Sequence, residues 1–116
     1  MERPVNCLIV DDNKVSRMLL QQILEKINGI TIIEEFDDPL KAKTFIESND
    51  IDILFLDIEM PGLSGLELLR MLHKRPLTIF TTGKQGYAVE AFELNVVDYI
   101  VKPFTLARVL HAVEQA

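Results

Sequence analysis

The sequence has little cysteine, no long apolar run and no excess of basic charge. Its one cysteine, Cys7, cannot form a disulfide within the chain and, lying in a predicted strand, is expected to be a buried, inert thiol. No apolar stretch approaches the roughly 18–20 residues of a membrane helix, and no basic segment followed by an apolar one resembles a signal peptide. The net charge of −6 argues against nonspecific nucleic-acid binding by this domain. Together these absences favour a protein of the cytoplasm that engages neither a membrane nor, through this domain, nucleic acid.

Internal repeats, linkers and segments of low complexity are also absent. With 48% hydrophobic and 26% charged residues among 116, the composition is that of a globular domain large enough to bury a core. We therefore expect residues 1–116 to form one domain.

Short apolar segments alternate with helical patterns along the chain. The segment 51–57 is apolar apart from Asp52 and a final Asp57, which is typical of a strand buried on both faces. Apolar residues at 15, 19, 23 and 27 have helical spacing, and Asn28-Gly29 is expected to cap the end of that helix. The predicted strands are 5–10, 30–36, 51–57, 77–82 and 98–101, and the predicted helices are 15–27, 39–47, 65–72, 87–94 and a last one capped by Thr105. This alternation predicts an α/β fold in which helices cover both faces of a parallel sheet.

Polar side chains follow the predicted strands where the strands end. They include Asp11, Asp12, Asp57, Thr82 and Lys102. Taken alone, Asp57 is more often a turn or helix cap than a functional group. The second acidic site, in an equivalent place after the first strand, favours function instead. Parallel topology brings these strand ends to one edge of the sheet, which is where ligands bind in open α/β folds.

Carboxylates gathered at such an edge repel one another, by about 4 kcal/mol for a pair at 4 Å and an effective dielectric constant near 20. Either one of them stays protonated or a cation binds. Mg²⁺ is the natural candidate, because it prefers a few carboxylates and bridges to phosphate oxygens. An aspartate between a metal and a lysine can act as a nucleophile and form an aspartyl phosphate.

Four motifs carry a resemblance to a known family. In order along the chain they are Val10-Asp-Asp12, Leu56-Asp57 with Met60-Pro-Gly62 and Gly65, Phe80-Thr-Thr82, and Asp98-Tyr-Ile-Val-Lys-Pro-Phe104. Over nearly all of its length the chain resembles a response-regulator receiver domain. The resemblance implies a flavodoxin-like doubly wound sheet with strand order 2-1-3-4-5.

The resemblance also implies roles for the acidic residues. Asp57 is expected to accept a phosphoryl group from the phosphohistidine of a sensor histidine kinase. Asp11 and Asp12 are expected to hold Mg²⁺ together with Asp57 and the backbone carbonyl of Glu59.

Other site residues follow from the same resemblance. Thr82 and Lys102 are expected to bind phosphoryl oxygens, and Tyr99 is expected to be the aromatic switch residue. The Lys102-Pro103 peptide bond is expected to be cis. Phosphorylation is expected to be read out on the face formed by the helix at 87–94, the strand at 98–101 and the last helix, where a homodimer could form.

Two charged residues are expected to modulate loss of the phosphoryl group. Glu59 stands two residues after Asp57 and Lys84 two residues after Thr82, so the pair is expected to flank the path of an attacking water. Gly83 departs from the family pattern, which usually has alanine or another small residue there. It is expected to give the loop extra freedom.

The segment from Phe80 to Phe104 is similar to receivers of LytTR-type transcription regulators, in which a DNA-binding domain follows the receiver. Because the sequence ends at Ala116, two interpretations stay open. It is an excised piece of a transcription regulator, or a stand-alone receiver that acts through protein partners.

Three other functions fit the residues less well. A Mg²⁺-dependent phosphatase with an aspartyl nucleophile would use Glu59 as general acid, but 116 residues leave no room for a substrate cap. A degenerate receiver that serves only as a scaffold is disfavoured because Asp57 and its expected partners are all present. Flavin binding on a similar fold is disfavoured because no phosphate-binding loop rich in Gly, Ser or Thr follows the first strand. The favoured interpretation is a phosphoacceptor switch and not an enzyme that acts on other molecules.

Overall fold

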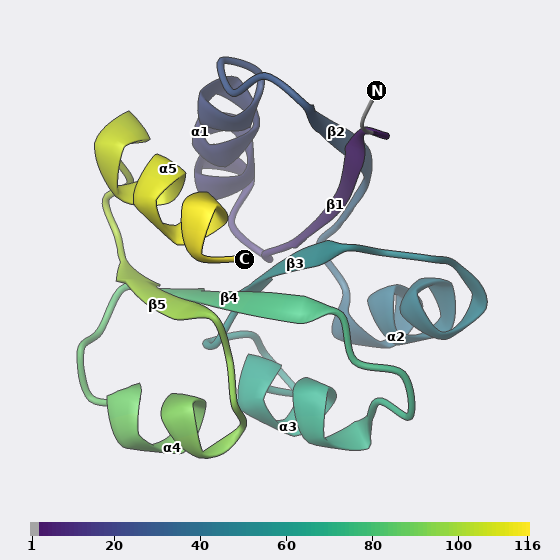
Figure 1. Ribbon diagram of the computed structural model, residues 1–116. Helices are drawn as coiled ribbons and strands as arrows, with labels where there is room; N and C mark the ends of the chain where they lie inside the picture. The colour runs from purple at the N-terminus through teal and green to yellow at the C-terminus, as the bar shows by residue number, and fades with distance from the viewer. Residues whose placement is uncertain (1–2) are drawn as a thin grey trace.

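The computed structural model describes residues 3–116, which form a five-stranded parallel sheet with helices on both faces (Figure 1). The strands are β1 (Val5–Val10), β2 (Ile30–Phe36), β3 (Ile53–Asp57), β4 (Leu77–Thr82) and β5 (Asp98–Val101). The helices are α1 (Lys14–Leu24), α2 (Pro39–Ser48), α3 (Gly65–Met71), α4 (Ala88–Glu93) and α5 (Leu106–Gln115). The strand order β2-β1-β3-β4-β5 and the parallel pairing of each neighbouring pair confirm the predicted flavodoxin-like α/β fold.

The central strand, β3, is buried along its whole length. Leu54 and Leu56 belong to an apolar cluster with residues of α2, α3 and α4, whereas Ile53 and Phe55 belong to a second cluster with α1 and α5. Successive side chains of a strand point to opposite faces, so a strand covered on both sides must be apolar throughout. Figure 1 shows the same division, with α1 and α5 on one side of the sheet and α2, α3 and α4 on the other. Cys7 lies in the second cluster, and burial raises the pKa of its thiol to about 12.

The first helix is shorter than predicted. α1 ends at Leu24 and not at residue 27. The amide groups of Lys26 and Ile27 donate to carbonyl oxygens only three residues back, at distances of 3.1 and 3.0 Å, so the helix tightens into turns. Gly29 does have a positive φ of 87°, but it stands in the turn before β2. The prediction that Asn28-Gly29 caps this helix is therefore wrong.

Polar side chains cap the first turns of α1, α2, α3 and α5. Asn13 accepts from the amide of Ser16 at the start of α1, and Thr105 accepts from the amide of Arg108 at the start of α5. Ser64 begins α3 with a capping box. These caps also fix the loops at the carboxyl edge of the sheet. Within residues 3–116, none of the helices has the length and apolar character needed to span a membrane.

Candidate functional site

Three carboxylates meet at the carboxyl edge of the sheet. Asp57 is the last residue of β3, and Asp11 and Asp12 directly follow the neighbouring strand β1. One oxygen atom of each carboxylate lies within 4.8 Å of one from each of the others. Asp11 and Asp57 are buried and Asp12 is exposed. Asp11 is held in place because its Oδ1 accepts from the amide of Asn13, at 2.8 Å.

A lysine that directly follows β5, a strand at one end of the sheet, faces this cluster. The Nζ atom of Lys102 lies 3.0 Å from Oδ2 of Asp11 and 3.6 Å from Oδ1 of Asp57. The Lys102 amide donates to the carbonyl oxygen of Thr82, at 2.7 Å, which ties the residue after β5 to the end of β4. The peptide bond between Lys102 and Pro103 is cis. The structure thus places one ammonium group against two buried carboxylates.

Burial and like charges act together on Asp57. Loss of solvent and then the neighbouring Asp11 carboxylate raise the pKa of Asp57 to about 7, and Lys102 opposes the shift. The amide of Glu59 donates to the same carboxylate and also opposes it. A carboxylate of this kind stabilises bound positive charge. The three carboxylates offer the hard oxygen ligands that Mg²⁺ prefers, and the donor set therefore fits this ion.

Gly65 allows α3 to begin against the backbone of Asp57. A Cβ atom added at Gly65 would lie 2.2 Å from the carbonyl oxygen of Asp57, a distance that real Cβ atoms do not adopt. The Gly65 amide donates to the carbonyl oxygen of Ile58, at 2.8 Å, and the Ser64–Glu67 capping box starts the helix at this point. The turn after β3 consequently packs closely against the backbone of Asp57.

Thr82 turns its hydroxyl toward a neighbouring loop. Its Oγ1 donates to Oε1 of Glu59, at 3.5 Å, and accepts from the amide of Lys84, at 3.2 Å. Lys84 also forms an ion pair with Glu59, with 3.3 Å between Nζ and Oε2. The structure therefore brings Asp11, Asp12, Asp57 and Lys102 together as one group, and Thr82, Glu59 and Lys84 as a second group beside it.

Tyr99 and Tyr87 lie against the same loop. The Tyr99 hydroxyl donates to the carbonyl oxygen of Lys84, at 2.6 Å, and accepts from the amide of Tyr87, at 3.2 Å. The Tyr87 hydroxyl donates to Oε2 of Glu59, at 3.3 Å. Sequence reasoning did not identify Tyr87 as a site residue. Its place at the start of a predicted helix gave no signal that its side chain would turn back to Glu59.

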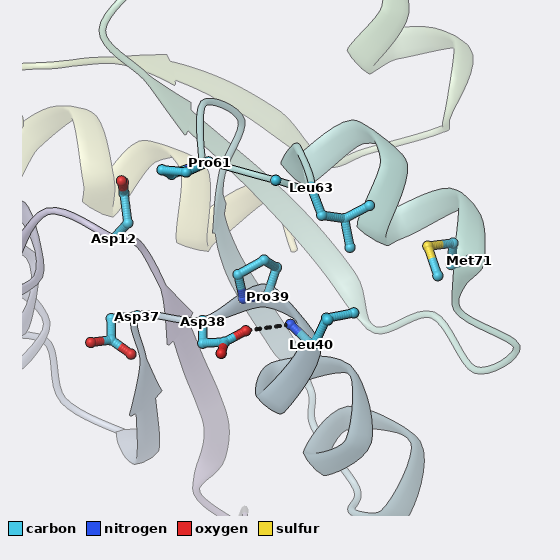
Figure 2. A pocket seen from close by; sticks show the side chains of 9 residues that line it. Asp12, Asp37, Asp38, Pro39, Leu40, Pro61, Leu63 and Met71 are labelled. Atoms are coloured by element: carbon cyan, nitrogen blue, oxygen red, sulfur yellow. Dashed lines mark hydrogen bonds between the residues drawn. The ribbon is translucent and has the colours of Figure 1, made fainter.

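A groove opens beside the exposed carboxylate of the cluster. It has a volume of about 580 Å³. Its lining residues are Asp12, Asp37, Asp38, Pro39, Leu40, Pro61, Gly62, Leu63 and Met71. Figure 2 shows Asp12 near Pro61 at one end, and Leu40, Leu63 and Met71 toward the other. The Asp12 side of the carboxylate cluster is therefore open to solvent.

Comparisons with known proteins agree with this arrangement. The model of the response regulator receiver domain matches residues 7–114. The transcriptional regulatory protein NatR of Bacillus subtilis is 41% identical over 99 residues, which are 83% of this chain and 42% of that protein. The sensory transduction protein LytR of Staphylococcus saprophyticus is 36% identical over 118 aligned residues, which cover 97% of this chain and 46% of that protein. The chain thus spans less than half the length of these curated relatives.

Solved structures show the same likeness. The response regulatory domain of protein mrkE from Klebsiella pneumoniae superimposes with a TM-score of 0.86 at 32% identity, covering 96% of this chain and 93% of that one. A structure titled as the CheX-CheY-BeF3-Mg+2 complex from Borrelia burgdorferi contains a chain that superimposes with a TM-score of 0.84 at 31% identity, covering 96% and 87%.

Fold and site together define a doubly wound sheet with a cluster of carboxylates at its carboxyl edge. The chain belongs to the response regulator receiver domains of two-component systems. Receiver domains are phosphoacceptor switches that bind Mg²⁺ at an acidic site and accept phosphate from sensor kinases.

Proposed function

We propose that this protein is a phosphoacceptor switch in which Asp57 takes a phosphoryl group from the phosphohistidine of a sensor histidine kinase. The observation that carries the proposal is the surrounding of Asp57. This buried carboxylate, with a raised pKa, lies beside two further carboxylates and 3.6 Å from the Lys102 ammonium. Charges of both signs at one buried oxygen suit a group that gains a dianionic substituent.

The transfer exchanges one bond to phosphorus for another. An Asp57 oxygen attacks phosphorus, the new O–P bond forms, and the N–P bond of the donor breaks with its electron pair going to the imidazole nitrogen. Lys102 is placed to bind a phosphoryl oxygen as the carboxylate loses its charge to the new bond. Asp11, Asp12, Asp57 and the Glu59 backbone carbonyl would hold Mg²⁺. When bound, the ion would offset the negative charge of the carboxylates and the phosphoryl oxygens.

The phosphoryl group then shifts a conformational equilibrium. Thr82 moves its hydroxyl toward the phosphoryl oxygens, and Tyr99 moves into the space that this opens. The change is read out on the face made by α4, β5 and α5, because β5 carries Tyr99 and α4 follows the loop that begins after Thr82. This face would also form a homodimer.

The ion pair between Glu59 and Lys84 flanks the mouth of the site and would lengthen the life of the phosphorylated state. Lys84 is 72% exposed, so the pair adds little stability. Its effect is to occupy the path of a water approaching in line with the O–P bond. A long-lived state suits control of transcription.

The output proposed is transcription through a LytTR-type DNA-binding domain. Relatives named as transcriptional regulatory proteins support it, since they are more than twice as long as the aligned segment. A stand-alone receiver that acts through protein partners is the alternative.

Phosphorylation of Asp57→Asn tests the proposal. The protein is incubated with acetyl phosphate and Mg²⁺, and intact mass and the lability of the adduct are measured. Wild type is expected to gain one phosphoryl group that hydroxylamine removes, as it does from an acyl phosphate, and Asp57→Asn none, because an amide is not a nucleophile of this kind. Asp37→Asn is the matched control, since Asp37 is an exposed aspartate after β2. Uptake by Asp57→Asn at the wild-type level would refute the assignment.

A further inference from the structure

Three donors, Thr82 at the end of β4 and Lys84 and Tyr87 in the loop that follows it, converge on one carboxylate. Glu59 lies in the β3–α3 loop, and its two oxygens lie 3.5 Å from the Thr82 hydroxyl, 3.3 Å from Nζ of Lys84 and 3.3 Å from the Tyr87 hydroxyl. The β4–α4 loop is therefore fastened to the β3–α3 loop through a single side chain.

The backbone of the same loop binds the hydroxyl group of Tyr99, the proposed switch residue. The Tyr99 hydroxyl donates to the Lys84 carbonyl oxygen and accepts from the Tyr87 amide. Tyr87 bonds to Glu59 with its side chain and to Tyr99 with its backbone amide, and Lys84 likewise contacts Glu59 with its ammonium group and Tyr99 with its carbonyl oxygen. A continuous set of hydrogen bonds joins Thr82, Glu59, Tyr87 and Tyr99.

The three donors to Glu59 differ in how firmly they are held. Lys84 is 72% exposed, so water screens its ion pair. Tyr87 is half-buried and packs, like Tyr99, against the apolar cluster that contains β3 and α4 residues. A packed ring has little freedom to lose when its hydroxyl bonds to a carboxylate, so Tyr87 is the stronger anchor.

We propose that Tyr87 is a positioning residue of the switch, acting through Glu59. Its hydroxyl fixes the Glu59 carboxylate where that carboxylate accepts the Thr82 hydroxyl, and so it stabilises the resting arrangement of the β4–α4 loop. The proposal rests on the function proposed above and extends it. For Thr82 to reach a phosphoryl group on Asp57 it must leave Glu59, and for Tyr99 to move it must leave Lys84 and Tyr87. Bonds made only in the resting state favour that state, and removing one shifts the equilibrium toward activation.

Tyr87→Phe tests the proposal because it keeps the ring and removes the hydroxyl. The probe is beryllofluoride with Mg²⁺, titrated into the protein while amide NMR signals of Thr82 and Tyr99 are followed. Without the probe, these signals in Tyr87→Phe are expected to lie displaced along the line that joins the resting and beryllofluoride positions of wild type. The midpoint of the titration is expected to fall about threefold to tenfold, which is the usual worth of one such hydrogen bond. A purely structural defect would move the signals off that line.

A double-variant cycle separates action through Glu59 from action through packing. In a Glu59→Gln background, Tyr87→Phe is expected to change the midpoint much less than it does in wild type, because the charged acceptor is gone. Thr44→Val is the matched control. It removes a hydroxyl that donates to the Leu40 carbonyl oxygen on α2, at 3.4 Å, and is expected to leave the titration unchanged.

Two results would overturn the proposal. One is a Tyr87→Phe protein with wild-type signals and midpoint, and the other is an effect of the same size with and without Glu59. Failure of the phosphoacceptor function would look different, because wild type itself would then not bind beryllofluoride with Mg²⁺.

Discussion

At the scale of single residues, two glycines near the site differ in the space that surrounds them. An added Cβ at Gly65 would collide with the Asp57 carbonyl oxygen at 2.2 Å, whereas one at Gly83 would meet nothing within 4 Å. Gly83 also has no positive φ that would require glycine. Glycine is therefore required at position 65, where the Asp57 backbone comes close, whereas the space and backbone at position 83 would also accept alanine.

We predict that Gly65→Ala lowers the free energy of unfolding by roughly 1–3 kcal/mol, as overpacking does, and slows phosphorylation because the Asp57 backbone must shift. Gly83→Ala is expected to raise the free energy of unfolding by about 0.4–1 kcal/mol, because alanine restricts the unfolded chain. Urea unfolding of both variants, with the acetyl phosphate reaction beside it, measures these effects. Equal stabilities of Gly65→Ala and wild type would contradict the close approach.

The raised pKa of Asp57 predicts a pH dependence of the metal-free protein. The folded state holds the Asp57 proton up to pH of about 7, and the unfolded state loses it near the ordinary value of 3.8. The unfolded state binds fewer protons between these values, so the free energy of unfolding falls as pH rises from about 4 to 7, by about 1.4 kcal/mol per unit of pKa displacement at most. Lys43 and Arg3 lower the pKa values of Glu47 and Asp52, respectively, to about 2, so the stability that these groups contribute rises from about pH 2 to their ordinary values of 4.5 and 3.8 and is present over most of the window.

The prediction is checked by urea unfolding between pH 4 and pH 8 with a metal chelator present. Asp57→Asn is expected to show a flatter profile than wild type and to be more stable at pH 8. Glu35, whose pKa burial also raises, contributes equally to both proteins and cancels in the difference. Adding Mg²⁺ is expected to stabilise wild type most at the high end of the window. Parallel profiles for the two proteins would contradict the prediction.

At the scale of elements, the alternation of segments predicted which strands and helices form along the chain, because apolar runs and cap residues are local signals. The order of the strands in the sheet was implied by the resemblance to receiver domains and not by the alternation. The end of α1 was misplaced because Ile27 still contributes to the core although its backbone has left the helix. A hydrophobic period reports burial, and burial continues past the last helical hydrogen bond. The meeting of Asp11, Asp12, Asp57 and Lys102 followed from topology, since parallel strands end at one edge.

Side-chain directions in the loops were less accessible to sequence reasoning. The pairing of Glu59 with Lys84 was an expectation from spacing, and the structure has an ion pair between them. The bond from Tyr87 to Glu59 was not anticipated, because it depends on the path of the backbone between β4 and α4. Glu59 thereby has contacts from Thr82 at the end of β4 and from two residues of the β4–α4 loop, and this loop is the element whose conformation the phosphoryl group would change.

At the scale of the whole molecule, exposed apolar side chains occur on both helices of the proposed output face. Val89 and Phe92 on α4 are 70% and 57% exposed, and Leu106 and Leu110 on α5 are 41% and 36% exposed. Val15 on α1 is 74% exposed, but α1 lies on the opposite side of the sheet from α4 (Figure 1). Apolar groups on elements next to β5 are suited to an interface that a movement of Tyr99 would remodel.

We predict that beryllofluoride with Mg²⁺ shifts the protein from monomer toward a twofold-symmetric dimer through α4, β5 and α5. The interface would then contain Phe92 from both copies of the chain, so one substitution changes the interface at two places. Phe92→Glu is expected to stay monomeric in sedimentation velocity runs with the activating salts, because it places a charge where apolar surface would be buried. It should still bind beryllofluoride. Val15→Glu is the matched control, an exposed apolar residue on α1, outside the face made by α4, β5 and α5, and is expected to dimerise like wild type. Dimerisation of Phe92→Glu together with loss of dimer in Val15→Glu would place the interface on α1 instead.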